Sequence, residues 1–405
     1  MKFSTFIFVL FTGLYLEAIF FQMLRLYSLK RPVPENVSDM YGQRSYERWI
    51  KCQRHLIRFS ITRFSTYYAL FLMLLFFDIS PLFTFDSFGS TLLRAALYGM
   101  IALCCFLVPA FRISIRNKYG LSQQNAKELV HYGLLSFISF FVSCIIFETF
   151  IPIQFRDNAL NTSVSLPKAI FFCLLFFAIR NIIHSTKQYK RCFVILDRNL
   201  LCELHQLAQA SGVSNIEFHR IFCGSDNMDA GIFRFFSRKV IMFSNALITS
   251  LDIDSICAIA AHEIGHAAHK HIVSTNILKA ACASGAIALA WSFFNFLFTY
   301  ASLSEQQQTL YSICLLLEIL IGIPLCIIIK NKICQAEELQ ADTYAARTKY
   351  GKVYANALKQ SEKKSIQELN PHPLLLLLTS DHPPLWQRIV NIEKELNRCN
   401  QNQSS

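Results

Sequence analysis

Residues 255–271 have the sequence SICAIAAHEIGHAAHKH, an apolar run that contains two histidines four positions apart, His262 and His266. Residues at this spacing lie on the same face of an α-helix, so both imidazoles project in one direction. This arrangement suits two nitrogen ligands of one tetrahedral zinc ion. Glu263 lies about 100° further round the helix, where it can hold the attacking water and accept its proton. The H-E-x-x-H pattern is typical of zinc metallopeptidases.

The same pattern can also arise by chance on a solvated helix face. Here, however, the neighbouring residues are mainly alanine and isoleucine, which predicts a buried helix. An unpaired buried glutamate between two histidines is costly. A metal site therefore explains the motif better than a solvated surface does.

A catalytic zinc site of this kind needs a third protein ligand and an open position for water. The stretch 337–342, EELQAD, places Glu338 and Asp342 four positions apart on one helical face. One carboxylate could bind the metal while the other orients a ligand histidine. A solvated acidic helix is the alternative, but the position of this stretch directly after an apolar span favours the metal site.

Four motifs, three of them specific and in the family's order, resemble those of one enzyme family, the seven-span zinc CAAX prenyl proteases of type 1, which trim prenylated proteins and yeast a-factor. The motifs are HEIGH at 262–266 followed by His271, ELQAD at 338–342, HPPLWQR at 382–388 and QMLRLY at 22–27. The resemblance extends from about residue 15 to about residue 395, and three of these motifs are specific.

The resemblance implies roles for individual residues. Glu338 is the implied third ligand of a single Zn²⁺ ion, and Asp342 is its implied partner in orienting a ligand histidine. His382 and Arg388 inherit a contact with substrate near the scissile bond. His269 and His271 could be additional ligands, but a solvated or structural role at the membrane boundary is the favoured interpretation of both.

The sequence departs from the family pattern at the expected substrate-binding edge. The family's S-N-A-Y segment corresponds to 228–231, MDAG, so that Asp229 and Ala230 are the implied substrate-binding residues. Ser244 stands where the family has an acidic residue, and Gln387 stands where it has glutamate. These changes leave the metal chemistry intact but bear on the choice of substrate.

The composition indicates an integral membrane protein, because 53% of the 405 residues are hydrophobic, only 16% are charged and 37 are phenylalanine. Residues 3–24 alone would extend about 33 Å as a helix, enough to cross a bilayer. Six further spans are predicted at 66–85, 91–111, 130–151, 169–183, 273–300 and 309–329.

Loop charges predict the orientation of these spans. Lysine and arginine are frequent in the loops 25–63 and 112–127 and around the motifs, whereas the opposite side has little beyond Lys2 and Arg156. By the positive-inside rule, the active site of a multi-pass protein then faces the cytosol, from the endoplasmic reticulum membrane in a eukaryote or the inner membrane in a bacterium. Membrane topology also accounts for the net charge of +12, so no nucleic-acid partner is expected.

The predicted fold is a multi-span α-helical membrane protein of about seven transmembrane helices with an α+β zincin-like metallopeptidase domain. That domain is expected to contain a helix at 196–210, strands at 216–222 and 239–243, and a C-terminal helix at 387–397. The predicted parts are transmembrane helices in 1–184, a metallopeptidase region in 185–271, two more spans in 272–330, the region with the third ligand in 331–398, and a disordered tail in 399–405.

Two other functions compete with cleavage of the C-terminal tripeptide of prenylated proteins. A membrane zinc protease of broad specificity, clearing misfolded or translocon-clogging proteins, would use the same chemistry. A non-catalytic transporter or metal-binding scaffold is more remote, because the glutamate of the H-E-x-x-H motif accompanies all three ligands. The expected partners are a peptide or protein substrate, with or without a prenyl group, and membrane lipid.

Overall fold

The computed structural model describes residues 3–76, 108–121, 182–183, 185–222, 228–299, 303–363 and 366–404. The chain divides into two compact units, of which the first comprises Met1–Leu26 and Gln43–Ser165, and the second comprises Tyr27–Gly42 and Leu166–Ser405. Every residue that the sequence assigns to the metal centre or to substrate lies in the second unit.

The first unit contains α1 (Phe3–Ser28) up to Leu26, and α2 (Gln43–Phe76). The two helices pack through aromatic side chains, with the rings of Tyr15 and Tyr68 stacked at a centroid distance of 4.3 Å. The stretch Ser4–Ser28 is long and apolar enough to cross a membrane. It contains nearly the whole of the first predicted span.

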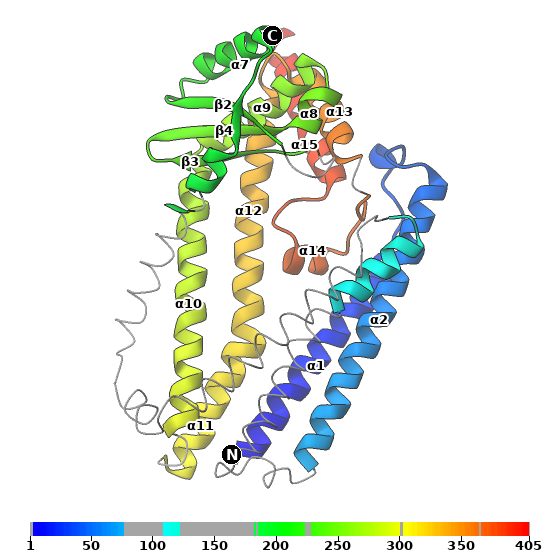
Figure 1. Ribbon diagram of the computed structural model, residues 1–405, viewed down its shortest axis with the longest axis vertical. Helices are drawn as coiled ribbons and strands as arrows, with labels where there is room; N and C mark the ends of the chain where they lie inside the picture. Colours follow the sequence, from blue (N-terminus) through cyan, green and yellow to red (C-terminus); the bar gives the residue numbers. More distant parts are fainter. Residues whose placement is uncertain are drawn as a thin grey trace. The chain divides into compact units, whose positions relative to one another are not determined.

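A four-stranded sheet forms the core of the polar part of the second unit (Figure 1). Across the sheet the strands are β1 (Cys192–Val194), β2 (Ile216–Ile221), β4 (Arg238–Ser244) and β3 (Ala230–Phe235). β2 and β4 are parallel, and the other two pairs are antiparallel. A two-residue turn joins β3 to β4, with Phe236 in the left-handed region at φ 52°. Because β3 is the last strand in this order, it is an edge strand.

Local sequence signals account for the N-termini of three helices. α7 (Arg198–Ala210) confirms the predicted helix, and its N-terminus is capped by Asp197, which accepts hydrogen bonds from the next turn. α8 (Asn245–Ser250) is capped in the same way by Ser244. α9 (Ile253–Ala268) carries the H-E-x-x-H motif and begins at Asp252, whose carboxylate accepts from the backbone N–H of Ser255 at 2.8 Å. α9 lies against the sheet and is almost wholly buried.

Two long apolar helical segments extend from the polar part of the second unit. α10 (His271–Thr299) corresponds to the predicted span at 273–300, and its stretch His271–Phe293 could cross a membrane. The second segment, Glu305–Ala346, consists of α11 (Glu305–Leu317), a π-helical turn η4 (Glu318–Gly322) and α12 (Ile323–Ala346). Pro324 is the second residue after the π turn. Because proline lacks an N–H, it cannot continue a regular α-helical hydrogen-bond ladder.

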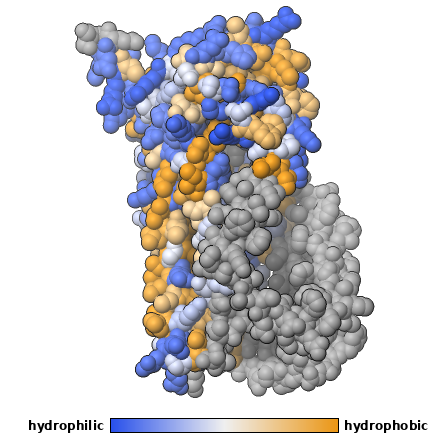
Figure 2. All heavy atoms as spheres, turned by 90° about the vertical axis from the view of Figure 1, so that its left-hand side faces the viewer, coloured by the Kyte–Doolittle hydropathy of each residue, from blue (hydrophilic) through white to orange (hydrophobic). Residues whose placement is uncertain are grey.

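Hydrophobic side chains dominate the lower part of the face that carries α10, whereas the upper part is mainly hydrophilic (Figure 2). The described residues thus contain three helical segments that could cross a membrane, which marks the chain as a membrane protein. The predicted span at 66–85 begins in α2 and passes beyond its end. The spans predicted at 91–111, 130–151 and 169–183 lie almost entirely outside the described residues.

The C-terminal region adds α13 (Gly351–Glu362), α14 (Pro373–Thr379) and α15 (Leu385–Ser404). α15 contains the predicted helix at 387–397, but it continues to Ser404, so the prediction of a disordered tail at 399–405 is wrong for 399–404. The physical reason is that neither glycine nor proline interrupts the sequence after Pro384, and the helix has nothing to end it.

The segment 27–42 packs against this C-terminal region within the second unit. Its short helix η1 (Glu35–Val37) buries Val37 completely, and Asn36 donates to the carbonyl of Trp386 at 2.9 Å. Arg31 donates to the carbonyl of Pro371 at 2.8 Å. These contacts fix the start of α15, and with it the position of Arg388.

α9 and α12 approach each other closely at Gly265, between the two motif histidines. A Cβ atom at this position would lie 3.1 Å from the Cα of Ala341 and 3.2 Å from its carbonyl oxygen. These are backbone atoms that cannot rotate away. The glycine therefore sets the separation between the helix with the histidines and the helix with Glu338.

We expect Gly265→Val to force α9 and α12 apart and to destabilise the protein by about 1–3 kcal/mol, as overpacked cores do. The same change should lower the amount of bound zinc, because Glu338 moves away from the histidines. Thermal unfolding and metal content of the purified protein measure the two effects. Gly285→Val in α10 is the matched control, because a Cβ there meets no atom within 4 Å; equal losses in both variants would contradict the assignment.

Candidate metal centre

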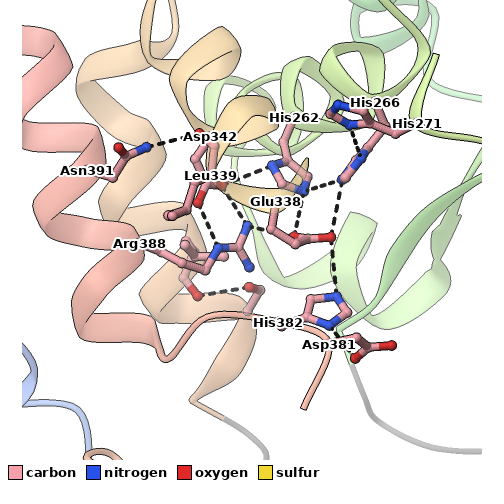
Figure 3. A network of polar contacts seen from close by, with 12 residues as sticks. His262, His266, His271, Glu338, Leu339, Asp342, Asp381, His382, Arg388 and Asn391 are labelled. Atoms are coloured by element: carbon pink, nitrogen blue, oxygen red, sulfur yellow. Dashed lines mark hydrogen bonds and ion pairs between the residues drawn. The ribbon is translucent and has the colours of Figure 1, made fainter. Parts of the chain in front are cut away.

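The two site helices bring His262, His266 and Glu338 together (Figure 3). The histidines project from one face of α9, and Glu338 projects toward them from α12. One ligand atom from each residue lies within 4.8 Å of the others. The sequence separation between His266 and Glu338 is bridged by the two long apolar segments, which leave and return to the same polar region.

The distances between the three groups suit a tetrahedral metal ion. The two Nε2 atoms of His262 and His266 are 3.1 Å apart. Each lies 3.4 Å from one carboxylate oxygen of Glu338. Ligand bonds of about 2.0–2.1 Å in a tetrahedron require ligand atoms about 3.3 Å apart, so the arrangement needs almost no adjustment.

A chain of hydrogen bonds fixes which nitrogen of His266 carries the proton. The Oε1 atom of Gln340 accepts from Nε2 of His271 at 3.1 Å, which leaves Nδ1 of His271 as an acceptor. That nitrogen lies 2.9 Å from Nδ1 of His266, which must therefore donate. The Nε2 lone pair of His266 then points at the centre of the site.

Two buried groups likewise determine which nitrogen of His262 carries the proton. Its Nδ1 lies 3.0 Å from Oδ1 of Asp342 and 2.9 Å from the hydroxyl of Tyr354. A carboxylate can only accept, so Nδ1 of His262 carries the proton. The Nε2 lone pair of His262 also points at the centre of the site. Such support by outer carboxylates is typical of histidine metal ligands.

With both imidazoles neutral, three acceptors therefore converge on one point, and positive charge between them, from a metal ion or a proton, relieves their repulsion. Oε2 of Glu338 is buried and accepts no hydrogen bond from the described residues. Burial by itself would lower the pKa of the His262 imidazole, but the carboxylates of Asp342 and Glu338 raise that pKa to about 9. The site thus favours positive charge, and two imidazoles with one carboxylate are a donor set that holds a divalent metal ion.

Asp342 is fully buried and is balanced by Arg388 from α15. The guanidinium donates through Nε to Oδ2 at 2.9 Å and through Nη2 to Oδ1 at 2.7 Å. Tyr354 also donates to Oδ1 at 2.6 Å. Burial opposes the charged form of Arg388, but the Asp342 carboxylate raises its pKa well above the usual range. This bidentate pair ties α15 to the metal centre.

Glu263 is buried beside the ligands and lines a cavity of ≈ 710 Å³. Both motif histidines and Glu338 line the same cavity. Burial raises the pKa of the Glu263 carboxyl, partly offset by the charges of the two histidines. A higher pKa makes a carboxylate a stronger base, which suits a group that must accept a proton from water.

His382 lies at the open side of the centre, and its side chain is 58% exposed. Its Nε2 is 3.5 Å from Oε1 of Glu338, and its Nδ1 is 2.9 Å from Oδ1 of Asp381. The side-chain amide of Gln335 on α12 donates to the carbonyl of Ser380 at 2.9 Å and so holds this loop in place. His382 can therefore face a ligand in the cavity, whereas the guanidinium of Arg388 is engaged by Asp342.

The predicted substrate-binding residues Asp229 and Ala230 also line the cavity, at the start of the edge strand β3. The backbone N–H of Asp229 donates to Oγ of Ser244 at 2.9 Å, and that oxygen also accepts from Leu247. The hydroxyl of Ser244 thus caps α8 and anchors the edge strand. An acidic residue at this position could accept the same two hydrogen bonds.

The structure adds residues that the sequence analysis did not place in the site. Tyr354 contacts both His262 and Asp342, yet it lies in α13 outside every motif, and no local pattern marks it. Gln340 lies within the quoted ELQAD motif without a role of its own. His271 is buried against His266 and orients it, which agrees with the structural role favoured for it over direct ligation. His269 donates through Nδ1 to the carbonyl of Gly265 at 2.9 Å.

Comparisons with known proteins agree with this geometry. The family model described as Peptidase family M48 matches residues 195–396, which include every residue of the centre. A CAAX prenyl protease 1 homolog of Arabidopsis thaliana is 27% identical over 178 residues, covering 42% of this chain and 41% of the relative. CAAX prenyl protease 1 of Saccharomyces cerevisiae is 26% identical over 176 residues, covering 39% of each. The matched segments thus span about two fifths of these relatives.

The overall fold has a counterpart among solved structures. The crystal structure of S. mikatae Ste24p superposes with a TM-score of 0.69 and 17% sequence identity, over 97% of this chain and 99% of that one. This match shows a shared fold across nearly the whole chain. Together with the match to the family model and the two curated relatives, it identifies the chain as a membrane protein of peptidase family M48, a family of metallopeptidases, and a relative of CAAX prenyl protease 1.

Proposed function

We propose that the chain is an integral-membrane zinc endopeptidase that removes the C-terminal tripeptide of prenylated C-a-a-X proteins. The observation that carries the proposal is the convergence of two imidazole lone pairs and the Glu338 carboxylate beside Glu263. His262, His266 and Glu338 would hold one Zn²⁺ ion. When bound, zinc makes water more acidic and polarises the scissile carbonyl.

In this mechanism the protein residues bind substrate and move protons. Glu263 accepts a proton from the attacking water and returns it to the leaving amine. His382, on the open side of the centre, donates to the oxygen of the scissile carbonyl as it gains negative charge. Arg388 holds Asp342, and Asp342 in turn holds the His262 ring in position. The ring orientation is thus set before substrate arrives.

The edge strand β3 supplies a surface for the substrate backbone. Residues 228–234 line the cavity, and the outer edge of β3 is not paired with another strand of the described sheet. An extended peptide can add to such an edge through backbone hydrogen bonds, which select for conformation more than for side chain. Asp229 and Ala230 would lie along this peptide.

The names of the two curated relatives support the choice of prenylated C-termini as substrates. The excess of lysine and arginine on the motif side supports a cytosolic active site in a multi-pass protein, whether the membrane is the endoplasmic reticulum or a bacterial inner membrane. Both helices that leave the centre, α10 and α12, continue into apolar segments. The cleavage point would therefore lie close to the membrane, where a prenyl group resides.

Glu263→Ala should retain zinc and lose turnover by a factor of about 10²–10⁴, because the general base is removed while the ligands remain. Metal content and cleavage of a fluorescent peptide by the full chain measure the two properties. Glu393→Ala, at an exposed position on α15, is the matched control. Normal cleavage by Glu263→Ala would exclude Glu263 as the base.

Asp342→Asn should weaken zinc binding by about 10- to 100-fold, as losses of an outer carboxylate partner usually do. The amide can no longer neutralise Arg388 or support the His262 proton as strongly. Competition with a chelator of known affinity gives the change. Asp254→Asn, exposed in the first turn of α9, should leave zinc affinity unchanged; if both variants bind zinc like the original chain, Asp342 has no such role.

A farnesylated peptide should be cleaved with at least about tenfold higher kcat/KM than its unprenylated twin. Each buried methylene contributes about 0.8 kcal/mol, so burial of two gives about 1.6 kcal/mol, which already exceeds a factor of ten. Parallel assays with the same preparation of the full chain make the comparison. Equal cleavage of the two peptides would favour the protease of broad specificity instead. Cleavage of both peptides that continues after the metal is removed would reject a zinc protease altogether.

A further inference from the structure

A single charged side chain other than histidine occurs in α10, and it lies on the cavity. Within His271–Thr299 the sequence contains no aspartate, glutamate or arginine and one lysine, Lys279. Lys279 is exposed and lines the same cavity as the metal ligands. A charged residue in an apolar span is costly in hydrocarbon, and such residues face a partner or a water-filled interior. The cavity explains how α10 accommodates this charge, but it does not identify the group that the charge binds.

The other permanent cations on the described cavity wall are already engaged. Arg388 is bound to Asp342 through two hydrogen bonds. Arg234 donates through Nε to the carbonyl of Phe236 at 2.9 Å, at the far turn of the β3–β4 hairpin. Lys279, in contrast, forms no hydrogen bond or ion pair with any described residue. Among the described cations on this wall, Lys279 is therefore the one whose charged group contacts no other described residue, and its ammonium is available to a ligand.

The position of Lys279 relative to the metal centre follows from the helix. His271, the first residue of α10, contacts His266 at 2.9 Å and so marks the edge of the centre. Lys279 lies eight positions further, about 12 Å along the helix axis. Thr275 and Asn276, each about one turn from either end of this stretch, line the same wall. A polar track on α10 thus leads from the metal centre to the lysine.

This separation matches the length of a tripeptide. Three residues in an extended conformation cover about 10 Å, and the flexible lysine side chain accommodates the remainder. A substrate cut three residues from its end carries a free carboxylate at that distance beyond the scissile bond. Capture of a chain-terminal carboxylate is a known mode of peptide recognition.

We propose that Lys279 binds the C-terminal carboxylate of the substrate and so selects the peptide bond three residues from the chain end. This inference rests on the proposed function, since it presupposes cleavage at the metal centre. A lysine ammonium forms a charge-assisted hydrogen bond with a carboxylate but gains little from a neutral amide. Such an anchor favours the bond three residues from the chain end, whereas an endopeptidase of broad specificity needs no such anchor.

The test compares two prenylated peptides of one sequence, one ending in a free carboxylate and one in an amide. KM and kcat are measured for the full chain in lipid nanodiscs, and affinity for both peptides is measured in the Glu263→Ala background, where no cleavage interferes. The original chain should bind the acid about tenfold more tightly than the amide, the effect of roughly one charge-assisted hydrogen bond. Lys279→Gln should remove this preference through KM, and Lys279→Arg should restore most of it.

Lys332→Gln is the matched control, because Lys332 is exposed on α12 and does not line the cavity. It should keep the full preference for the acid. An unchanged acid-to-amide ratio in Lys279→Gln would overturn the proposal. An equal loss of binding for both peptides would also overturn it, and would indicate that Lys279 binds a lipid phosphate or stabilises the fold. If the original chain cleaves neither peptide, the proposed function itself has failed, which is a different result.

Discussion

The structure depends on placing three hydrogen-bond acceptors against one another in a buried site. Two imidazole nitrogens 3.1 Å apart, with a carboxylate 3.4 Å from each, repel unless a cation lies between them. The surrounding groups make this arrangement compulsory, because Gln340 and His271 determine the proton position on His266, and Asp342 determines it on His262. A protein that bound no cation here would gain nothing from these contacts, since an unrelieved buried cluster of acceptors is destabilising.

The same constraint explains the packing of the helices around the site. α9 and α12 must approach closely for Glu338 to reach both histidines, and Gly265 permits that approach. Burying Asp342 to hold His262 requires a compensating charge, and Arg388 provides it from a helix at the end of the chain. α15 is in turn fixed by the segment 27–42, so contacts between distant parts of the sequence support one imidazole ring.

The link between this site and the membrane is also direct. α10 begins at the residue that orients His266, and α12 carries Glu338 and Asp342 at the end of a continuous helical segment of 42 residues. Ligands mounted on such helices have a fixed depth relative to the apolar layer. The polar wall of α10, which ends at Lys279, extends the site from the metal centre into the apolar segment. Chemistry and membrane position therefore follow from the same two helices.

The sequence by itself determined the local features. The four-residue spacing of His262 and His266 predicts a shared helical face, the ELQAD stretch supplies the further carboxylates, and apolar composition predicts long helices, because these signals depend on neighbouring residues alone. The strands at 216–221 and 238–244 were predictable for the same reason. The tail at 399–404 was not, since its polar composition favours disorder although α15 continues through it.

Only the tertiary structure decided which distant groups meet. Tyr354 contacts His262, which is 92 positions away in the sequence, and no residue next to Tyr354 in the sequence predicts that contact. Arg388 could equally have faced substrate, but the buried carboxylate of Asp342 engages it through two hydrogen bonds. The sequence does not distinguish Lys279 from the other lysines, and only the structure places it on the cavity wall. The reason is physical: proton positions, charge balance and cavity walls arise from side chains that meet across elements, and no local pattern contains them.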